Sequence, residues 1–142
     1  MKKKILIVIA NYYKDISNGL YNSAIDEIIR INKKTISLSA KYQKKFYISK
    51  IEVPGVFEIP VSIARNINKY DGFIALGCVV KGQTPHFNFI SQASTEAIMK
   101  LSIDKKKPIG NGIITCLSKK QAISRKKKGR EAASAVISVL LS

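Results

Sequence analysis

Short apolar runs alternate along this chain with stretches that carry apolar residues at helical spacing, and this alternation restricts the fold most. The runs are KILIVIA (4–10), KFYISKIEV (45–53), DGFIALGCVV (71–80) and IGNGIITC (109–116). The first run is continuously apolar, as expected of a strand covered on both faces. Helical patterns cover 16–32, about 57–70, a stretch that ends near 103, and a final region up to the C-terminus.

This order of strands and helices predicts an α/β fold. We expect a four-stranded parallel sheet with helices on both faces, a doubly wound, flavodoxin-like three-layer sandwich. The length suits a single domain, residues 1–142, and no linker rich in Pro, Gly or Ser divides the chain. Ligands of such sheets bind beyond the carboxyl ends of the strands, so we expect the site at that edge.

The formal net charge of +16 allows two interpretations. Basic runs at 2–4, 105–107 and 119–130 could follow a phosphate backbone. However, the excess is almost wholly lysine, whereas base and phosphate recognition favours the planar arginine fork, and no aromatic residues are interleaved to stack bases. We therefore favour a general enrichment in lysine and do not expect nucleic acid as a partner.

The chain shows no feature of an exported, membrane-spanning or zinc-binding protein. The apolar run of MKKKILIVIA is short and lacks a cleavage site of small residues, and no stretch approaches the roughly 18 apolar residues of a membrane span. Cys78 and Cys116 lack the paired spacing and additional histidines of a zinc site. We expect a cytoplasmic protein with two reduced, packed thiols and no metal.

The only histidine, His86, stands in KGQTPHFNFI (81–90), directly beyond the most apolar strand. Thr84 is a suitable N-cap and Pro85 a suitable first helical residue, which places His86 in the first helical turn. Unpaired N–H groups and the helix dipole favour an anion there, and Gly82 permits close approach of the backbone. An imidazole at this place could exchange protons with a substrate, but an exposed histidine without a function fits the spacing equally well.

Two further groups are expected at the same edge of the sheet. Glu58, in VPGVFEIP (53–60), could accept hydrogen bonds from a polyol, or it could simply complement the dipole of the helix that begins there. Tyr12, with Tyr13 beside it, follows the first strand and offers a flat face for a ring, although tyrosines in loops are often only half-buried packing. An imidazole, a carboxylate and an aromatic ring are thus predicted to converge on one rim.

Two segments resemble the signatures of the 6,7-dimethyl-8-ribityllumazine synthase family. They are VPGVFEIP (53–60) and the longer, more specific ALGCVVKGQTPHFNFI (75–90); weaker similarity includes AIDEII (24–29), KPIGNGIIT (107–115), QAISR (121–125) and KGREAASA (128–135). The resemblance implies a cofactor-independent condensation in riboflavin biosynthesis. In it, 5-amino-6-(D-ribitylamino)uracil reacts with 3,4-dihydroxy-2-butanone 4-phosphate to give the lumazine, inorganic phosphate and water.

The resemblance also implies roles for individual residues. His86 matches the catalytic acid and base, Tyr12 the aromatic residue that stacks on the pyrimidine, and Glu58 the acceptor of a ribityl hydroxyl. The residues implied in substrate binding are Tyr12, Val56, Phe57, Glu58, Val79, Val80 and Asn111. Those implied in phosphate binding are Gln83, Thr84, Arg125 and Lys128.

Assembly into a homopentamer is implied as well, because the family forms its active sites between adjacent subunits. Asn111 stands where many members contribute an aromatic side chain to a neighbour's site, and Asn11 and Tyr13 replace the usual residues around the stacking aromatic. Some members build twelve pentamers into a shell. Since the linker between Arg125 and Lys128 and the N-terminal segment are shorter than in many members, we expect isolated pentamers instead.

Three other functions stay open at this point. A related riboflavin synthase of the same fold would use two lumazine molecules, but neither carries the phosphate that Arg125 and the GQTPHF loop suit. A basic nucleic-acid-binding module would bind any duplex with a steep salt dependence. A degenerate paralogue would bind a flavin-like ligand without turnover, and Asn111 and Asn11 keep this possibility open.

Overall fold

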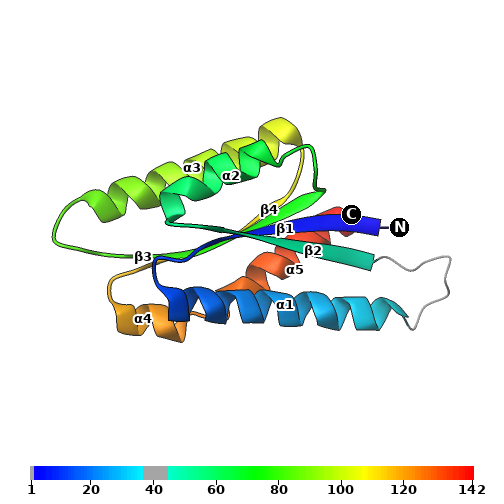
Figure 1. Ribbon diagram of the computed structural model, residues 1–142, viewed down its shortest axis with the longest axis horizontal. Helices are drawn as coiled ribbons and strands as arrows, with labels where there is room; N and C mark the ends of the chain where they lie inside the picture. The colour runs from blue at the N-terminus through cyan, green and yellow to red at the C-terminus, as the bar shows by residue number, and fades with distance from the viewer. Residues whose placement is uncertain (1, 37–44) are drawn as a thin grey trace.

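Four parallel strands form one sheet in the order β2-β1-β3-β4 in the computed structural model, which describes residues 2–36 and 45–142 (Figure 1). The strands are β1 (Lys2–Ala10), β2 (Lys45–Val53), β3 (Gly72–Val80) and β4 (Ile109–Cys116). β1 pairs with β2 along its whole length, from Lys2 opposite Lys45 to Ala10 opposite Val53. The carboxyl ends of the strands therefore meet at one edge.

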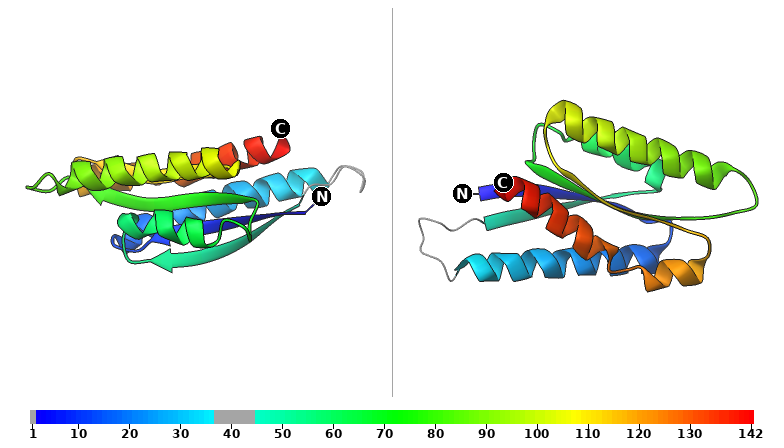
Figure 2. Two further views of the ribbon diagram at one scale, coloured as in Figure 1. Left: turned by 90° about the horizontal axis from the view of Figure 1, so that it is seen from above. Right: turned by 180° about the vertical axis from the view of Figure 1, so that it is seen from behind.

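Helices cover both faces of this sheet (Figures 1 and 2). One face carries α1 (Lys14–Ile36), α4 (Lys119–Ser124) and α5 (Lys128–Leu141). The other carries α2 (Ile59–Arg65), preceded by the short 3₁₀ helix η2 (Val56–Glu58), and α3 (His86–Lys105). This arrangement confirms the predicted α/β three-layer fold with an all-parallel sheet. Within the described residues, no helix combines the length and apolarity that crossing a bilayer requires.

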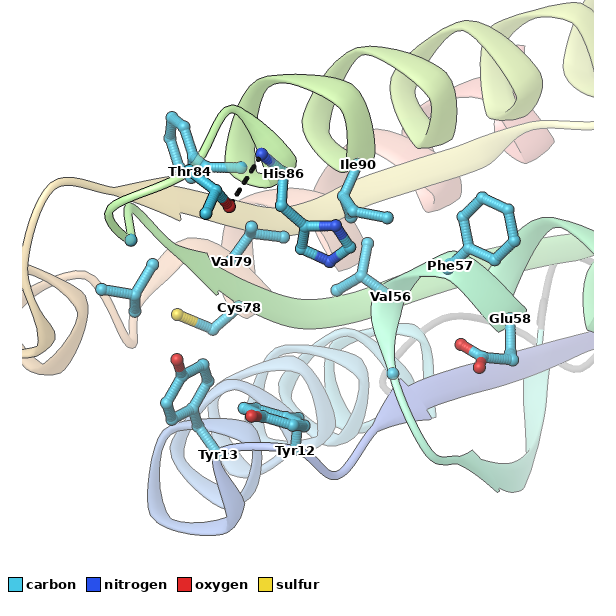
Figure 3. Close-up of a pocket in the computed structure, with 14 residues that line it drawn as sticks. Tyr12, Tyr13, Val56, Phe57, Glu58, Cys78, Val79, Thr84, His86 and Ile90 are labelled. Atoms are coloured by element: carbon cyan, nitrogen blue, oxygen red, sulfur yellow. Dashed lines mark hydrogen bonds between the residues drawn. The ribbon is translucent and has the colours of Figure 1, made fainter.

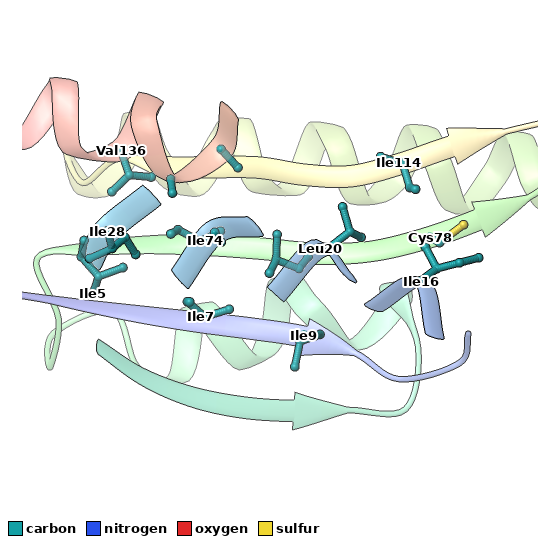
Figure 4. Packing of buried hydrophobic residues seen from close by; sticks show 14 of the residues in the cluster. Ile5, Ile7, Ile9, Ile16, Leu20, Ile28, Ile74, Cys78, Ile114 and Val136 are labelled. Atoms are coloured by element: carbon teal, nitrogen blue, oxygen red, sulfur yellow. The ribbon is translucent and has the colours of Figure 1, made fainter. Parts of the chain in front are cut away.

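The central strand β1 is buried on both faces, which explains its continuous apolar sequence. Ile5, Ile7 and Ile9 pack beneath α1 and α5 in one core cluster (Figure 4). Leu6 and Val8 point to the opposite face and belong to a second cluster with residues of α2 and α3. The sheet is thus fixed between two separate cores, and its carboxyl edge forms a firm base for a site.

Two predicted helices differ from the structure at their ends. The helix expected over about 57–70 ends at Arg65, because the Asn66 side chain donates to the carbonyl of Ser62 at 2.8 Å. A continuing helix would use that carbonyl for the backbone N–H of Asn66. The final helical region is divided into α4 and α5 at Arg125, which leaves the helical conformation with φ −104° and ψ 17°.

The α1–α5 seam is the contact surface between those two helices, and it includes the segment that joins α4 to α5. The hydroxyl of Ser23 on α1 donates to the carbonyls of Leu20 and Lys126, at 2.9 Å each. Gly129, in the first turn of α5, lies directly against the carbonyl of Leu20, with no room for a β-carbon. The backbone after Arg125 is therefore attached to α1.

A buried carboxylate links the same two helices. The side chain of Glu27 on α1 is 3% exposed and accepts from Arg30 and, at 3.0 Å, from Arg130 of α5. The hydrogen bond from Arg30 and the two positive charges lower the pKa of Glu27, although burial acts in the opposite direction. Because both arginines are more than half exposed, the strength of these ion pairs is limited by solvent screening.

Acid is expected to weaken the fold through Glu27. Its pKa is lowered in the folded state, so its contribution to the free energy of unfolding is complete above the unfolded pKa and is lost as the pH falls through the folded pKa. As the pH falls from about 6 to about 3, the free energy of unfolding of Glu27→Gln should therefore decrease less than that of the unmodified protein. Urea unfolding at each pH measures the difference. Equal losses in both proteins would show that Glu27 does not contribute. The exposed residue Glu96 provides the control variant, Glu96→Gln.

Candidate active site

A cavity of about 650 Å³ opens at the carboxyl ends of β1 and β3 (Figure 3). Eight of the twelve residues that the sequence predicts for the site line it: Tyr12, Val56, Phe57, Glu58, Val79, Val80, Thr84 and His86. They come from three separate segments. One is the turn after β1, the second is the 3₁₀ helix η2, and the third runs from the end of β3 to the start of α3. A cavity of this size accommodates one or two small molecules.

His86 enters the cavity from the start of α3, and its imidazole points inward between Val56, Val79 and Ile90 (Figure 3). The helix begins one residue later than predicted: Pro85 takes the N-cap position. The hydroxyl of Thr84 instead accepts a long hydrogen bond, 3.4 Å, from the backbone N–H of His86. The imidazole makes no hydrogen bond within the described part of the chain, so both ring nitrogens can face a ligand.

The turn after β2 places a carboxylate and an aromatic ring on the rim opposite Thr84. Gly55 is extended, and its carbonyl accepts the N–H of Glu58 at 3.2 Å, which closes η2. Val56 is buried in the core and fixes this turn. Phe57, 66% exposed, and Glu58 are consequently left at the surface, where both border the cavity.

Two adjacent tyrosines line the cavity from the turn after β1. Tyr12 is 75% exposed, and its ring meets that of Tyr13 edge to face, with 4.9 Å between the centroids and 77° between the planes. Tyr13 is half-buried and packs against the core beneath α1. The cavity thus has one ring that is free to receive a flat ligand and a second ring that supports it.

Comparison with known proteins identifies the family. The family model described as 6,7-dimethyl-8-ribityllumazine synthase matches residues 2–142. The chain belongs to this family. A 6,7-dimethyl-8-ribityllumazine synthase of Bartonella tribocorum is 37% identical over an alignment of 150 positions, gaps included, which covers 99% of this chain and 91% of the relative. The 6,7-dimethyl-8-ribityllumazine synthase 1 of Rhodopseudomonas palustris is 38% identical, over 96% of this chain and 83% of the relative.

A more distant relative supports the same assignment. The 6,7-dimethyl-8-ribityllumazine synthase of Cutibacterium acnes is 32% identical, over 96% of this chain and 80% of its own length. Membership in the lumazine synthase family, predicted from the two signature segments, is therefore confirmed over nearly the whole chain. The family is one of transferases of riboflavin biosynthesis, as the sequence predicted.

Four residues expected in a lumazine synthase site lie outside the cavity of the single chain. Gln83 lies between two lining residues but does not line the cavity itself. Arg125 donates to the carbonyl of Thr115 at 3.4 Å, and Thr115 is paired in the sheet with the lining residue Val79. Lys128 forms an ion pair with Glu131 at 2.8 Å, and Asn111 accepts the N–H of Ile113 at 3.1 Å.

The cavity also includes residues to which the family resemblance gave no binding role, chiefly Cys78 and Tyr13, the latter expected at this edge beside Tyr12. Both could have been found from strand geometry: Cys78 lies on the same face of β3 as Val80, and Tyr13 is next to Tyr12. Burial and the neighbouring Cys116 raise the pKa of the Cys78 thiol to about 12. Because the thiolate is the reactive form, Cys78 acts as an apolar wall rather than as a nucleophile.

Proposed function

We propose that the protein condenses 5-amino-6-(D-ribitylamino)uracil with 3,4-dihydroxy-2-butanone 4-phosphate, and that it thereby makes 6,7-dimethyl-8-ribityllumazine, inorganic phosphate and water in riboflavin biosynthesis. The observation that carries this proposal is the family match over residues 2–142. The cavity supports it, because His86, Glu58 and Tyr12 line one space at the carboxyl edge of the sheet. These groups suit a proton transfer, a polyol and a flat ring.

The ribitylaminouracil is proposed to bind along the Tyr12 and Glu58 side of the cavity. The exposed ring of Tyr12 offers a face on which the pyrimidine can stack, and the Glu58 carboxylate accepts hydrogen bonds from ribityl hydroxyls. Val56, Phe57, Val79 and Val80 complete the walls around ring and chain. The largely apolar wall favours the flat ring while the single carboxylate orients the polar chain.

The butanone phosphate is proposed to bind at the start of α3, with its phosphate held by the backbone amides of Gln83 and Thr84. The first turn of a helix directs N–H groups and partial positive charge toward an anion, and α3 is a helix of 20 residues. The guanidinium of Arg125, which donates to the carbonyl of Thr115 near the end of β4, is proposed to supply a full positive charge. Lys128 is proposed to add to the positive field there.

His86 is proposed to carry the protons between the two reactants. Imine formation moves protons from the substrate amine to the departing carbonyl oxygen, which leaves as water. Elimination then removes a carbon-bound proton as the phosphate departs, and ring closure of the second amine onto the carbonyl formed by tautomerisation requires further proton transfers and releases a second water. All of these steps are redox-neutral. A cavity that holds both reactants together converts an encounter between two molecules into a reaction within one complex, which supplies much of the remaining acceleration.

The Arg125→Ala variant tests the phosphate assignment. It should raise the KM for butanone phosphate by an amount equivalent to about 1.5 to 3 kcal/mol, because a charge-assisted contact is lost. The KM for the ribitylaminouracil should stay nearly constant in steady-state assays. Arg65→Ala, which removes an exposed arginine from α2, is the matched control. An increase confined to the uracil substrate would contradict the proposed role of Arg125.

The protein is further proposed to act in the cytoplasm as a homopentamer whose sites lie between subunits, with Asn111 facing a neighbour's site. Exposed apolar side chains support association, among them Phe89, Met99 and Ile103 of α3, which are 59 to 66% exposed. The charge of +16 favours isolated pentamers over a closed shell at low salt, because like charges repel. Light scattering should give about five times the chain mass of 15.7 kDa; a sixty-subunit particle or a monomer would contradict this.

The activity itself is tested with the purified protein, both substrates and detection of lumazine fluorescence. Product that requires both substrates supports the proposed reaction. A folded protein without product would instead support a binding protein that has lost turnover, and titration with lumazine would then measure its affinity. Salt-dependent binding to duplex DNA serves as a separate measurement, because the condensation does not require it.

A further inference from the structure

We propose that the hydroxyl of Tyr13 is an additional phosphate-binding group, which donates a hydrogen bond to the phosphate of the four-carbon substrate. The identity of that substrate rests on the proposed function, whereas the site itself is argued from the geometry of Tyr13. This residue is not among those that the family signatures in the sequence assign to binding. Its backbone begins α1, since its carbonyl accepts the N–H of Ser17 at 2.9 Å.

The ring of Tyr13 is held from two sides. One side packs against the core cluster beneath α1, and the edge-to-face contact with Tyr12 restricts the other at 4.9 Å between centroids. The side chain is half-buried, in contrast to the 75% exposure of Tyr12. A fixed ring positions its hydroxyl in advance, so that little conformational entropy is lost when a ligand accepts its hydrogen bond.

The hydroxyl of Tyr13 has no hydrogen-bond partner within residues 2–36 and 45–142, although the residue lines the cavity. The hydroxyl is not buried, so water can reach it, and a ligand in the cavity can replace that water as its acceptor. Burial, together with Tyr12 and Cys78, raises the pKa of Tyr13. The hydroxyl therefore remains a proton donor throughout the neutral and mildly alkaline range.

The position of Tyr13 selects the phosphorylated reactant. In Figure 3 its ring lies beside Cys78, on the side of the cavity where Thr84 lies, whereas Glu58 borders the opposite side. Glu58 suits the hydroxyl groups of a polyol, and a phenol donor suits the oxygens of a phosphate, which only accept. Cys78 cannot replace it, because a thiol is a weak donor.

The apolar walls of the cavity should strengthen this contact. Val79, Val80 and Ile90 line the same cavity, and a hydrogen bond in a poorly hydrated environment is electrostatically stronger than one in water. Since the phosphate is charged, the bond from Tyr13 belongs to the stronger, charge-assisted class. The hydroxyl would then act together with the amides at the start of α3.

Tyr13→Phe tests the proposal, with Tyr47→Phe as the matched control, because each change removes one hydroxyl and keeps the ring, and Tyr47 is an exposed residue of β2 outside the cavity. Tyr13→Phe should raise the KM for butanone phosphate roughly tenfold, with the KM for the ribitylaminouracil and the urea unfolding midpoint nearly unchanged. Tyr47→Phe should leave the KM for butanone phosphate within about twofold. An unchanged KM for butanone phosphate in Tyr13→Phe, or an equal rise in both variants, would overturn the proposal.

Calorimetric titration with inorganic phosphate separates this inference from the proposed reaction. Tyr13→Phe should weaken phosphate binding roughly tenfold relative to the unmodified protein and to Tyr47→Phe. If the unmodified protein makes no lumazine but Tyr13→Phe still loses phosphate affinity, the reaction is wrong and the phosphate contact stands. If lumazine is made and phosphate affinity is the same in all three proteins, the reaction stands and Tyr13 does not bind phosphate.

Discussion

Replacement of His86 by alanine is expected to slow lumazine formation by roughly two to four orders of magnitude, the usual contribution of a positioned acid or base. His86 is exposed and its imidazole makes no hydrogen bond within the described residues, so the fold should tolerate the change. The imidazole points into the cavity, and the other lining groups, such as Glu58, come from different segments and should keep their positions. The loss should therefore appear in kcat rather than in substrate binding.

Steady-state assays with both substrates measure this effect, and the affinity for a lumazine-like inhibitor shows whether the cavity is intact. Asn88→Ala is the matched control, because Asn88 is an exposed residue in the same helical turn and does not line the cavity. Turnover of His86→Ala within about twofold of the control would remove the imidazole from the mechanism. Loss of inhibitor binding along with turnover would indicate a structural role instead.

Gly129→Ala is expected to destabilise the protein by about 2 to 3 kcal/mol. A β-carbon at this position would overlap the backbone carbonyl of Leu20, and backbone atoms cannot move aside as a flexible side chain can. α1 and α5 would have to separate along the seam that also holds Ser23. Alanine favours the helical conformation by about 1 kcal/mol over glycine, and the expected value is the net loss after this gain.

Urea unfolding with an unchanged m-value measures the difference in stability. Gly82→Ala is the appropriate comparison, because no atom of the described residues lies within 4 Å of the position where its β-carbon would be. That variant should change the free energy of unfolding by less than about 0.5 kcal/mol. Equal stability of the two variants would mean that α1 and α5 adjust to a methyl group at no cost.

The sheet could be predicted from the sequence because its strands are short, apolar and separated by helical patterns. The predicted run 45–53 coincides with β2, and 109–116 coincides with β4. The predicted helix ends were less accurate than the predicted strands, because a helix end depends on single side chains. Asn66, for example, ends α2 with a side-chain hydrogen bond that the spacing of apolar residues does not reveal. The start of α3 differed by one residue because Pro85, rather than Thr84, occupies the N-cap position.

Some of the residues that line the cavity could also be predicted, because the order of the strands determines which segments meet. Groups that directly follow a parallel strand, such as Tyr12 and His86, meet at the carboxyl edge whatever the details of the loops. Arg125 follows a short helix, and its position depends on how the backbone after it attaches to α1. Asn111 lies in the middle of β4, away from the single chain's cavity. Its proposed contact involves a second subunit, which the sequence of one chain does not place.

The attachment of the α4–α5 junction to α1 joins two parts of the chain that are far apart in sequence. Tyr12 and Tyr13 precede α1, and Arg125 precedes the junction residue Lys126, whose carbonyl is bonded to Ser23. The residues proposed to bind the pyrimidine and the phosphate are therefore connected to each other through α1. A substitution that loosens the bond between Ser23 and the Lys126 carbonyl should therefore change the stability of the fold and the proposed alignment of the two reactants together.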